Sequence, residues 1–242
     1  MTLDEQYASI EEKIPKVFDA GKKAEHDHFW DVFQQNGERV DYRYAFAQQW
    51  TNEIFKPKYD IKPTNAERLF FNSGVTQSGL DAAIASGIYF DFSKATNMSY
   101  AFSSMRLEKI TFDISLESCT TSASTGTLFG VSPMLTAIKK IILKSDGSTP
   151  FGSNMFNQLA KLADITFEGV IGKALDMKSC SSLSVESMKN IISHLANYKG
   201  TDNEFVHKLT LHDDAWARLE ASGTSPTGTT WKEYVDSLGW NT

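Results

Sequence analysis

The sequence predicts a mixed α+β protein in which short parallel strands from repeated segments stack into an irregular solenoid between helical ends. Three patterns predict this fold: apolar residues recur with heptad spacing near the N-terminus, similar strand segments recur through the middle, and the last third carries helix start and stop signals. We therefore expect a helical stem (1–36), an aromatic-rich cap (37–86), the repeats (87–183) and a C-terminal helical cap (184–242).

Composition limits the classes of function. The chain has 242 residues, of which 41% are hydrophobic and 22% charged, so it can bury a sizeable core. A net charge of −6 with no basic stripe argues against nucleic-acid binding. The acidic N-terminus is unlike a secretory signal, and no apolar run reaches the roughly 20 residues of a membrane span. We expect synthesis in a cytoplasm without membrane insertion, and two ordinary thiols at Cys119 and Cys180.

The stem is predicted from apolar residues spaced alternately four and three apart, as in a coiled coil. Pro15 interrupts the pattern, so we expect two helical pieces or one helix that starts near Pro15. The heptad spacing predicts self-association of the stem; the alternative is one amphipathic helix packed on its own domain. The seam residues that would make the oligomer contacts are Leu3, Tyr7, Ile10, Ile14 and Val17.

Residues 29–71 hold 11 of the 29 aromatic residues, which predicts a tightly packed cap for the next domain. Residues 42–46 alternate aromatic and other side chains, as a half-buried strand does. Stacking of these rings on carbohydrate is the alternative interpretation.

The repeats are three segments in which a Phe is followed, after a variable gap, by a Leu or Ile and then by an Ile that opens a short strand. The strand-opening residues Ile110, Ile141 and Ile165 are 31 and 24 residues apart, a period typical of solenoids. The three segments begin at Ala101-Phe102, Leu128-Phe129 and Met155-Phe156, with looser copies at 87–92, 173–177 and 207–211.

Alternation within these strands predicts two faces. The residues expected to point into a shared core are Ile110, Phe112, Ile141, Leu143, Ile165, Phe167, Leu209 and Leu211. Their neighbours would line an open sheet face that suits a polar partner. This predicted contact surface consists of Lys109, Thr111, Asp113, Lys140, Ile142, Lys144, Asp164, Thr166 and Glu168.

Three helices are predicted in the C-terminal cap. The first begins after Ser184 and runs to about Tyr198, the second begins at Asp213 or Asp214, and the third spans 231–238 before Gly239. The last strand is expected near 207–211. The hydroxyl-rich segments 118–127 and 145–150 are interpreted as solvated loops that interrupt the repeats.

The pattern of Phe, Leu and Ile-Thr-Phe at 101–112, repeated at 155–167, resembles the bacterial cell-surface, BspA-like type of leucine-rich repeat. The resemblance covers about residues 87–211, although the repeat spacing is irregular. Segments 21–37 and 198–211 are similar to leucine-rich repeat proteins encoded by phages and prophages of gut Firmicutes.

This resemblance implies a virion protein of the tail, in a tail fibre, tail tip or baseplate. The stem would then contact other virion proteins and sister chains, with a trimer favoured by analogy with fibres, and the sheet face would contact a host-surface glycan or protein. The alternatives are a purely structural virion protein and a bacterial surface adhesin, which the absence of a signal peptide and wall anchor disfavours. The family supplies no functional residues to transfer.

No catalytic constellation, cofactor motif or metal-binding pattern is recognised. His26 and His28 stand two residues apart and would face different ways on a helix, so they do not predict a shared metal ion. Nucleophile-elbow, phosphate-loop and dinucleotide motifs are missing from the sequence. We therefore expect a non-enzymatic protein, with a carboxylate pair for glycoside cleavage as the one chemistry that sequence leaves open.

Overall fold

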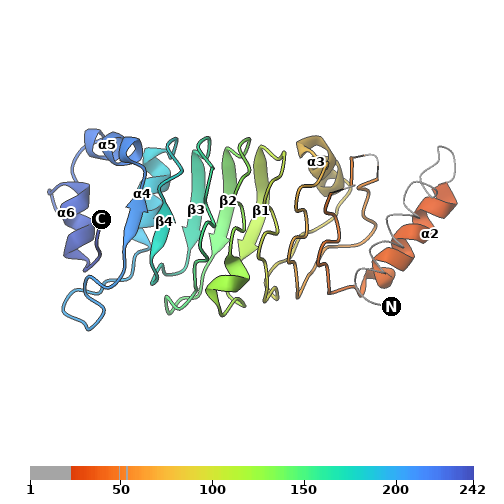
Figure 1. Cartoon of the computed structure of the whole chain (residues 1–242), viewed down its shortest axis with the longest axis horizontal. Coiled ribbons are helices and arrows are strands. Elements are labelled where there is room, and N and C mark those ends of the chain that lie inside the picture. Colours follow the sequence, from red (N-terminus) through yellow and green to blue (C-terminus); the bar gives the residue numbers. More distant parts are fainter. Residues whose placement is uncertain (1–22, 49, 53) are drawn as a thin grey trace.

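A computed structural model describes residues 23–242 except 49 and 53, with the side chains of 23–27 also left undescribed. The predicted seam residues Leu3, Tyr7, Ile10, Ile14 and Val17 lie outside the described residues. The described chain is a mixed α/β structure with a small parallel sheet. It is elongated, with α2 at one end, α5 and α6 at the other, and the strands side by side between them (Figure 1).

The elements follow one another in an irregular order. The helices are α2 (Lys23–Phe33), α3 (Gln77–Ala85), α4 (Val185–Ser193), α5 (Asp213–Ala221) and α6 (Trp231–Ser237), with 3-10 turns at Gln35–Gly37 and Ser122–Thr125. The strands are β1 (Lys109–Ser115), β2 (Ala137–Ile142), β3 (Asp164–Glu168), β4 (Leu175–Met177) and β5 (Leu209–Leu211). β1, β2 and β3 form one parallel sheet, and β4 pairs in parallel with β5.

The register of the three-stranded sheet corrects the predicted alignment of the repeats. Ile138, not Ile141, pairs with Ile110 and Ile165, so the true spacing is 28 and 27 residues. Ile141 instead pairs with Ile114 and with Phe167. The difference arises because register shifts, as at β-bulges, let successive strands cover the same distance with fewer residues. The predicted inward side chains are nevertheless all buried.

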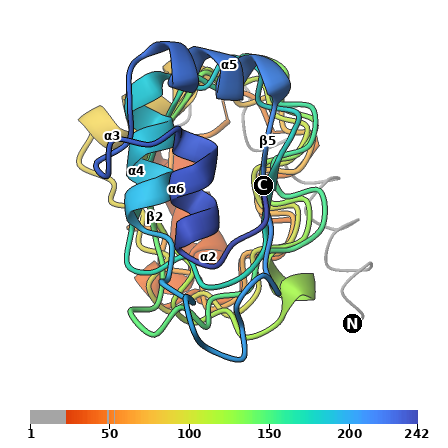
Figure 2. The same cartoon turned by 90° about the vertical axis from the view of Figure 1, so that its left-hand side faces the viewer.

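Opposite the sheet, five segments of similar shape lie next to one another; we name residues 42–48, 66–72, 98–104, 125–131 and 152–158 the wall segments. Each of the first four donates backbone hydrogen bonds to the next, as at Phe46 N to Leu69 O (2.8 Å) and Phe129 N to Met155 O (3.2 Å). The stacking therefore begins near residue 41, inside the region predicted to be a cap. In a view along the long axis, the wall and the sheet lie on opposite sides of one interior (Figure 2).

Two predicted local structures are wrong in this wall. Residues 42–46 form turns, with Tyr44 at φ 53°, and not a strand; a turn that repeats every few residues buries Tyr42 and Phe46 as a pleat would. The segment 118–127 is not a solvated loop throughout, because Ser124 and Thr125 are buried where the chain enters the fourth wall segment.

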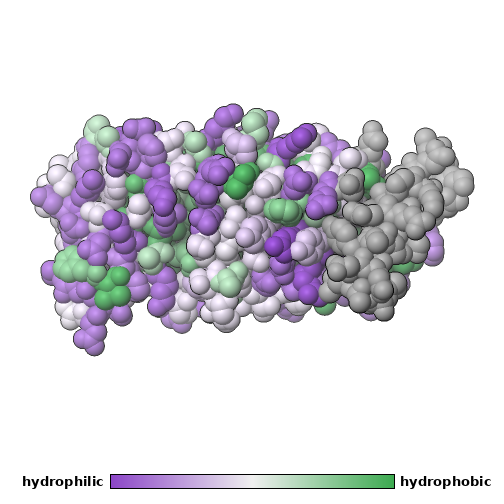
Figure 3. Space-filling view, in the orientation of Figure 1, coloured by the Kyte–Doolittle hydropathy of each residue, from purple (hydrophilic) through white to green (hydrophobic). Residues whose placement is uncertain are grey.

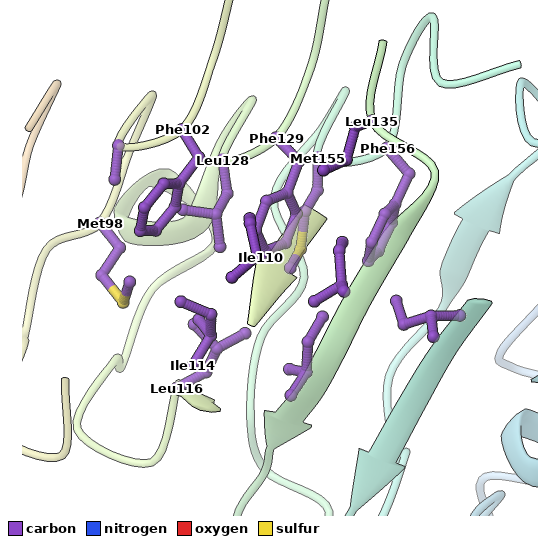
Figure 4. Packing of buried hydrophobic residues seen from close by; sticks show 14 of the residues in the cluster. Met98, Phe102, Ile110, Ile114, Leu116, Leu128, Phe129, Leu135, Met155 and Phe156 are labelled. Atoms are coloured by element: carbon purple, nitrogen blue, oxygen red, sulfur yellow. The ribbon is translucent and has the colours of Figure 1, made fainter. Parts of the chain in front are cut away.

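A column of phenylalanines forms the middle of the core. Successive ring centres lie 5.2 Å apart for Phe46 and Phe70, 5.9 Å for Phe70 and Phe102, 6.0 Å for Phe102 and Phe129, and 5.7 Å for Phe129 and Phe156. The last three rings stand in a row facing Ile110 and Ile114 of β1 (Figure 4). Because each ring packs on the next, the column stabilises the stack of segments beyond the burial of its area.

Helices cover both edges of the three-stranded sheet. From α3, Gln77 Oε1 accepts hydrogen bonds from the backbone N–H of Glu108 (3.2 Å) and Lys109 (2.9 Å) beside β1. From α4, Ser187 Oγ accepts from Ile165 N (3.0 Å) and Asn190 Oδ1 from Phe167 N (2.7 Å) of β3. At each edge of the sheet, side chains of α3 or α4 thus take the hydrogen-bonding positions of a further strand.

The C-terminal helices largely confirm their predicted starts. Ser184 caps α4 and accepts from Ser187 N, but α4 ends at Ser193, before the predicted Tyr198. α5 begins at Asp213, with His212 as its cap, and α6 has a complete capping box of Thr230 and Glu233.

Candidate binding surfaces

Eight of the nine predicted contact residues lie in β1, β2 or β3, Lys144 lies two residues after β2, and the nine are not equally open. Four are partly covered: Asp113, Lys140, Ile142 and Lys144. The other five, Lys109, Thr111, Asp164, Thr166 and Glu168, are exposed. For Lys140 and Ile142 the register shift in β2 explains the partial burial, because it takes these residues out of strict alternation.

Ion pairs join the strands across this face. Lys139 Nζ lies 3.0 Å from Asp113 Oδ1, and Lys140 Nζ lies 2.7 Å from Glu168 Oε2. The hydrogen bond to Glu168 raises the pKa of Lys140 above its usual range. Because these pairs are open to solvent, they contribute little to stability. The sheet face is therefore a surface of mixed sign whose central charges already have partners.

Side chains of the wall segments form two rows that run along the wall. The third and seventh residue of each segment have left-handed backbone with φ between 51° and 61°. Because the segments pair residue for residue, these side chains recur at matching positions along the wall. The two rows are Tyr44, Arg68, Tyr100, Thr127 and Asn154, and Gln48, Asn72, Ser104, Val131 and Gln158.

Four of the wall side chains form a cluster on the surface, which we name the Tyr–Arg cluster: Tyr44, Arg68, Phe71 and Tyr100. The Arg68 guanidinium carbon lies 5.1 Å from the centre of the Tyr44 ring, 4.8 Å from that of Tyr100 and 6.0 Å from that of Phe71. Arg68 Nη1 also donates to the Tyr44 hydroxyl and to Glu67 Oε1 (2.7 Å).

The Tyr–Arg cluster is held in place and still reachable. All four side chains are half-buried, and 30% of the Arg68 side chain is exposed. Cation–π contacts of a half-buried guanidinium contribute about 0.5–2 kcal/mol, so the rings and the cation hold one another in place before any partner binds. The sequence did not reveal the cluster, because Tyr44, Arg68 and Tyr100 are 24 and 32 residues apart and only the wall pairing brings them together.

Within the described part of the chain, no three His, Cys, Asp or Glu side chains come together as metal ligands. The thiols of Cys119 and Cys180 are free and buried. Burial raises the pKa of both, that of Cys180 to about 12.

The described surface carries scattered apolar side chains. The face in Figure 3 is mostly hydrophilic with small apolar spots between polar residues. Among the described helices, none is long and apolar enough to cross a bilayer. No protein family model, curated protein or solved structure matches the chain.

Proposed function

We propose that the chain is a solenoid of the leucine-rich type, with a helical N-terminal stem and a helical C-terminal cap, that acts by binding and not by catalysis. The paired wall segments, the parallel sheet and the phenylalanine column support this proposal, since each segment buries its apolar side only against its neighbours. α5 and α6, at the C-terminal end, support the assignment of a cap.

We further propose that it is a phage tail protein, in a fibre or baseplate, that attaches to the host surface. The origin rests on the sequence resemblance, and the binding role rests on the Tyr–Arg cluster. Tyrosine and arginine dominate the energetics of protein interfaces, and here they are pre-ordered by three wall segments. Pre-ordering lowers the entropy lost on binding. The exposed residues of the sheet face form the second predicted contact surface.

The proposal is tested with the fluorescently labelled full chain and intact cells of a panel of gut Firmicutes, with a Gram-negative species as the negative control. We expect saturable binding to some Firmicutes and at least a tenfold loss in Arg68→Ala, because truncating a hot spot costs about 2 kcal/mol or more. Arg43→Ala is the matched control, since Arg43 lies on the same wall but pairs with Asp41 (2.7 Å).

The outcomes distinguish the Tyr–Arg cluster from the sheet face, and host attachment from a purely structural role. Loss in Arg68→Ala alone supports the Tyr–Arg cluster, whereas loss in a Lys109→Ala, Thr166→Ala double variant moves the contact to the sheet face. No binding to any cell at micromolar concentration contradicts host attachment and favours a purely structural role in the virion.

The stem is proposed to join sister chains, with a trimer favoured, and other virion proteins. Because Trp30 and Phe33 of α2 are buried in the core, the test keeps α2 and changes only the seam. Light scattering of the full chain should give an oligomer that Ile10→Asp with Ile14→Asp converts to a monomer. A monomeric parent chain would rule the oligomer out.

A further inference from the structure

The hydrogen-bond ladder of the wall stops after its fifth segment. In each of the first four segments, the third, fifth and seventh residues donate their backbone N–H to the next segment, at 2.8–3.2 Å. The equivalent donors of the fifth segment are the N–H groups of Asn154, Phe156 and Gln158. Within the described chain these three find no acceptor, although β4 lies next along the molecule.

A pocket of about 200 Å³ opens at this break, between residues 151–156 on one side and 174–176 on the other. Beyond the pocket, the chain after β4 contacts the fifth wall segment directly. There Cys180 Sγ lies 3.7 Å from Phe156 O, and Ser179 Oγ lies 3.3 Å from Asn157 Oδ1. The volume corresponds to about seven water molecules at roughly 30 Å³ each. The pocket is therefore the size of a single small ring and too small for a folded segment.

The lining combines hydrogen-bond donors, a carboxylate acceptor and aromatic side chains. Ser153, Asn154 and Phe156 line one side of the pocket, the last two with backbone N–H groups that have no acceptor in the described chain, and Asp176 lines the other side. Asp176 is fixed by accepting from Lys178 N at 3.0 Å and by an ion pair with Lys178 Nζ at 3.2 Å. The half-buried ring of Phe151 packs edge to face on Phe167, with 6.4 Å between ring centres.

This combination selects a class of ligand. Unpaired backbone N–H groups require acceptors, which disfavours a purely apolar ligand. The carboxylate accepts hydrogen bonds from hydroxyl groups. An aromatic ring packs on the apolar C–H face of a pyranose. A neutral polyhydroxylated ring meets all three conditions.

We propose that this pocket binds one hexose residue of a surface glycan. The inference rests on the proposed function in that the glycan belongs to the host surface, and it names the ligand class that the wall binds. The hydroxyl oxygens of the sugar accept from Asn154 N and Phe156 N, one hydroxyl donates to Asp176, and the ring lies against Phe151.

The test is an NMR titration of the ¹⁵N-labelled full chain with the methyl glycosides of glucose, galactose and N-acetylglucosamine. At least one sugar should shift the amide resonances of Asn154 and Phe156 saturably, with a Kd on the order of millimolar. The amides of Thr127 and Phe129, which are equivalent but already bonded to the fifth segment, should not move. If none of the three sugars shifts Asn154 or Phe156, the pocket is a water site and the proposal fails.

Asp176→Asn tests the acceptor, since asparagine keeps the turn to Lys178 N but loses the charge. Affinity should fall about tenfold, the loss expected for a hydrogen bond to a charged group. Asp146→Asn is the matched control, because Asp146 makes the same kind of turn, to Ser148 N (2.8 Å), away from the pocket. An unchanged affinity in Asp176→Asn overturns the assigned geometry.

The two proposals fail in different ways. Sugar-dependent amide shifts without binding to any cell would contradict host attachment and leave the hexose pocket standing. Cell binding that is lost in Arg68→Ala, with no amide shift by any sugar, would leave host attachment standing and remove the pocket.

Discussion

Ten residues of the wall segments hold a left-handed backbone although none of them is glycine. This conformation costs an L-residue about 1–2 kcal/mol and is least tolerated by β-branched side chains, whereas asparagine adopts it readily. Asn72 and Asn154 suit their positions, and Val131, at φ 61°, does not. The wall therefore stores backbone strain at identifiable residues.

Val131→Asn should raise the free energy of unfolding by about 1 kcal/mol, since it relieves this strain while Val131 N still donates to Asn157 O. Urea unfolding followed by circular dichroism measures the change. Val40→Asn is the control, because Val40 is also exposed but has no left-handed backbone. Equal shifts in the two variants would show that the gain comes from removing an exposed apolar side chain.

Glycine is required where the chain leaves β3. Gly169 has φ 91°, and a Cβ there would lie 2.2 Å from Leu143 O, which is backbone and cannot move aside. Gly169→Ala should therefore lower the free energy of unfolding by about 2 kcal/mol or more. Gly87, at φ 93°, has a similar backbone but open space around it. Gly87→Ala should therefore lower the free energy of unfolding by only about 1 kcal/mol. Thermal unfolding of both variants gives the comparison, and equal losses would contradict the steric reason.

At the scale of elements, helices complete the sheet. Asn190 of α4 accepts from Phe167 N (2.7 Å) and donates to Phe167 O (3.4 Å), so one amide side chain takes the place of a neighbouring strand. This arrangement closes an edge that would otherwise pair with another chain.

Asn190→Ala leaves the N–H of Phe167 without its partner beside a buried side chain. The free energy of unfolding should fall by about 1–3 kcal/mol, the cost of an unsatisfied buried donor. Ser193→Ala on the exposed side of the same helix should change it by less than about 0.5 kcal/mol. Chemical unfolding measures both, and hydrogen exchange at Phe167 should quicken in Asn190→Ala alone. Protection that persists there would contradict the role assigned to the Asn190 amide.

The sequence patterns predict most of the helices and strands but not the register in which the strands pair. Ser184 and Asp213 marked helix starts because capping is a local signal. The middle strand offered isoleucines at 138, 141 and 142, and a variable gap after Phe129 left no local rule to choose among them. The sequence does not predict the wall segments at 42–48 and 66–72, because they repeat a turn geometry that apolar alternation does not indicate. The Tyr–Arg cluster depends on wall pairing across 24 residues or more, and the pocket depends on the approach of residues 151–156 to 174–176.

At the scale of the whole molecule, stability is carried from neighbour to neighbour. The phenylalanine column and the wall ladder join residues 42–158 without a break, whereas no wall hydrogen bond joins the fifth segment to β4 in the described chain. In a stack of this kind, a weak junction divides the cooperative unit. The part from β4 to α6 should therefore open before the part that contains the wall.

The two cysteines report on the two parts. Cys119 lies before the break and Cys180 beyond it, and both are buried. Only a thiolate reacts with a disulfide reagent, and the pKa of about 12 keeps folded Cys180 protonated at pH 8. Opening lowers that pKa toward the ordinary 9.0, so the rate of labelling measures the open fraction.

In rising urea at pH 8, a Cys119→Ala chain, which retains Cys180, should label at lower denaturant than a Cys180→Ala chain, which retains Cys119. The two labelling curves should merge only where circular dichroism shows global unfolding, because there both thiols are exposed in the same unfolded chain. Unfolding midpoints of the two variants serve as the control, since a difference in overall stability would shift each curve with its own midpoint. Coincident curves for variants of equal midpoint would show that the break in the ladder does not divide the molecule, and that packing of β3 against α4 transmits stability across it.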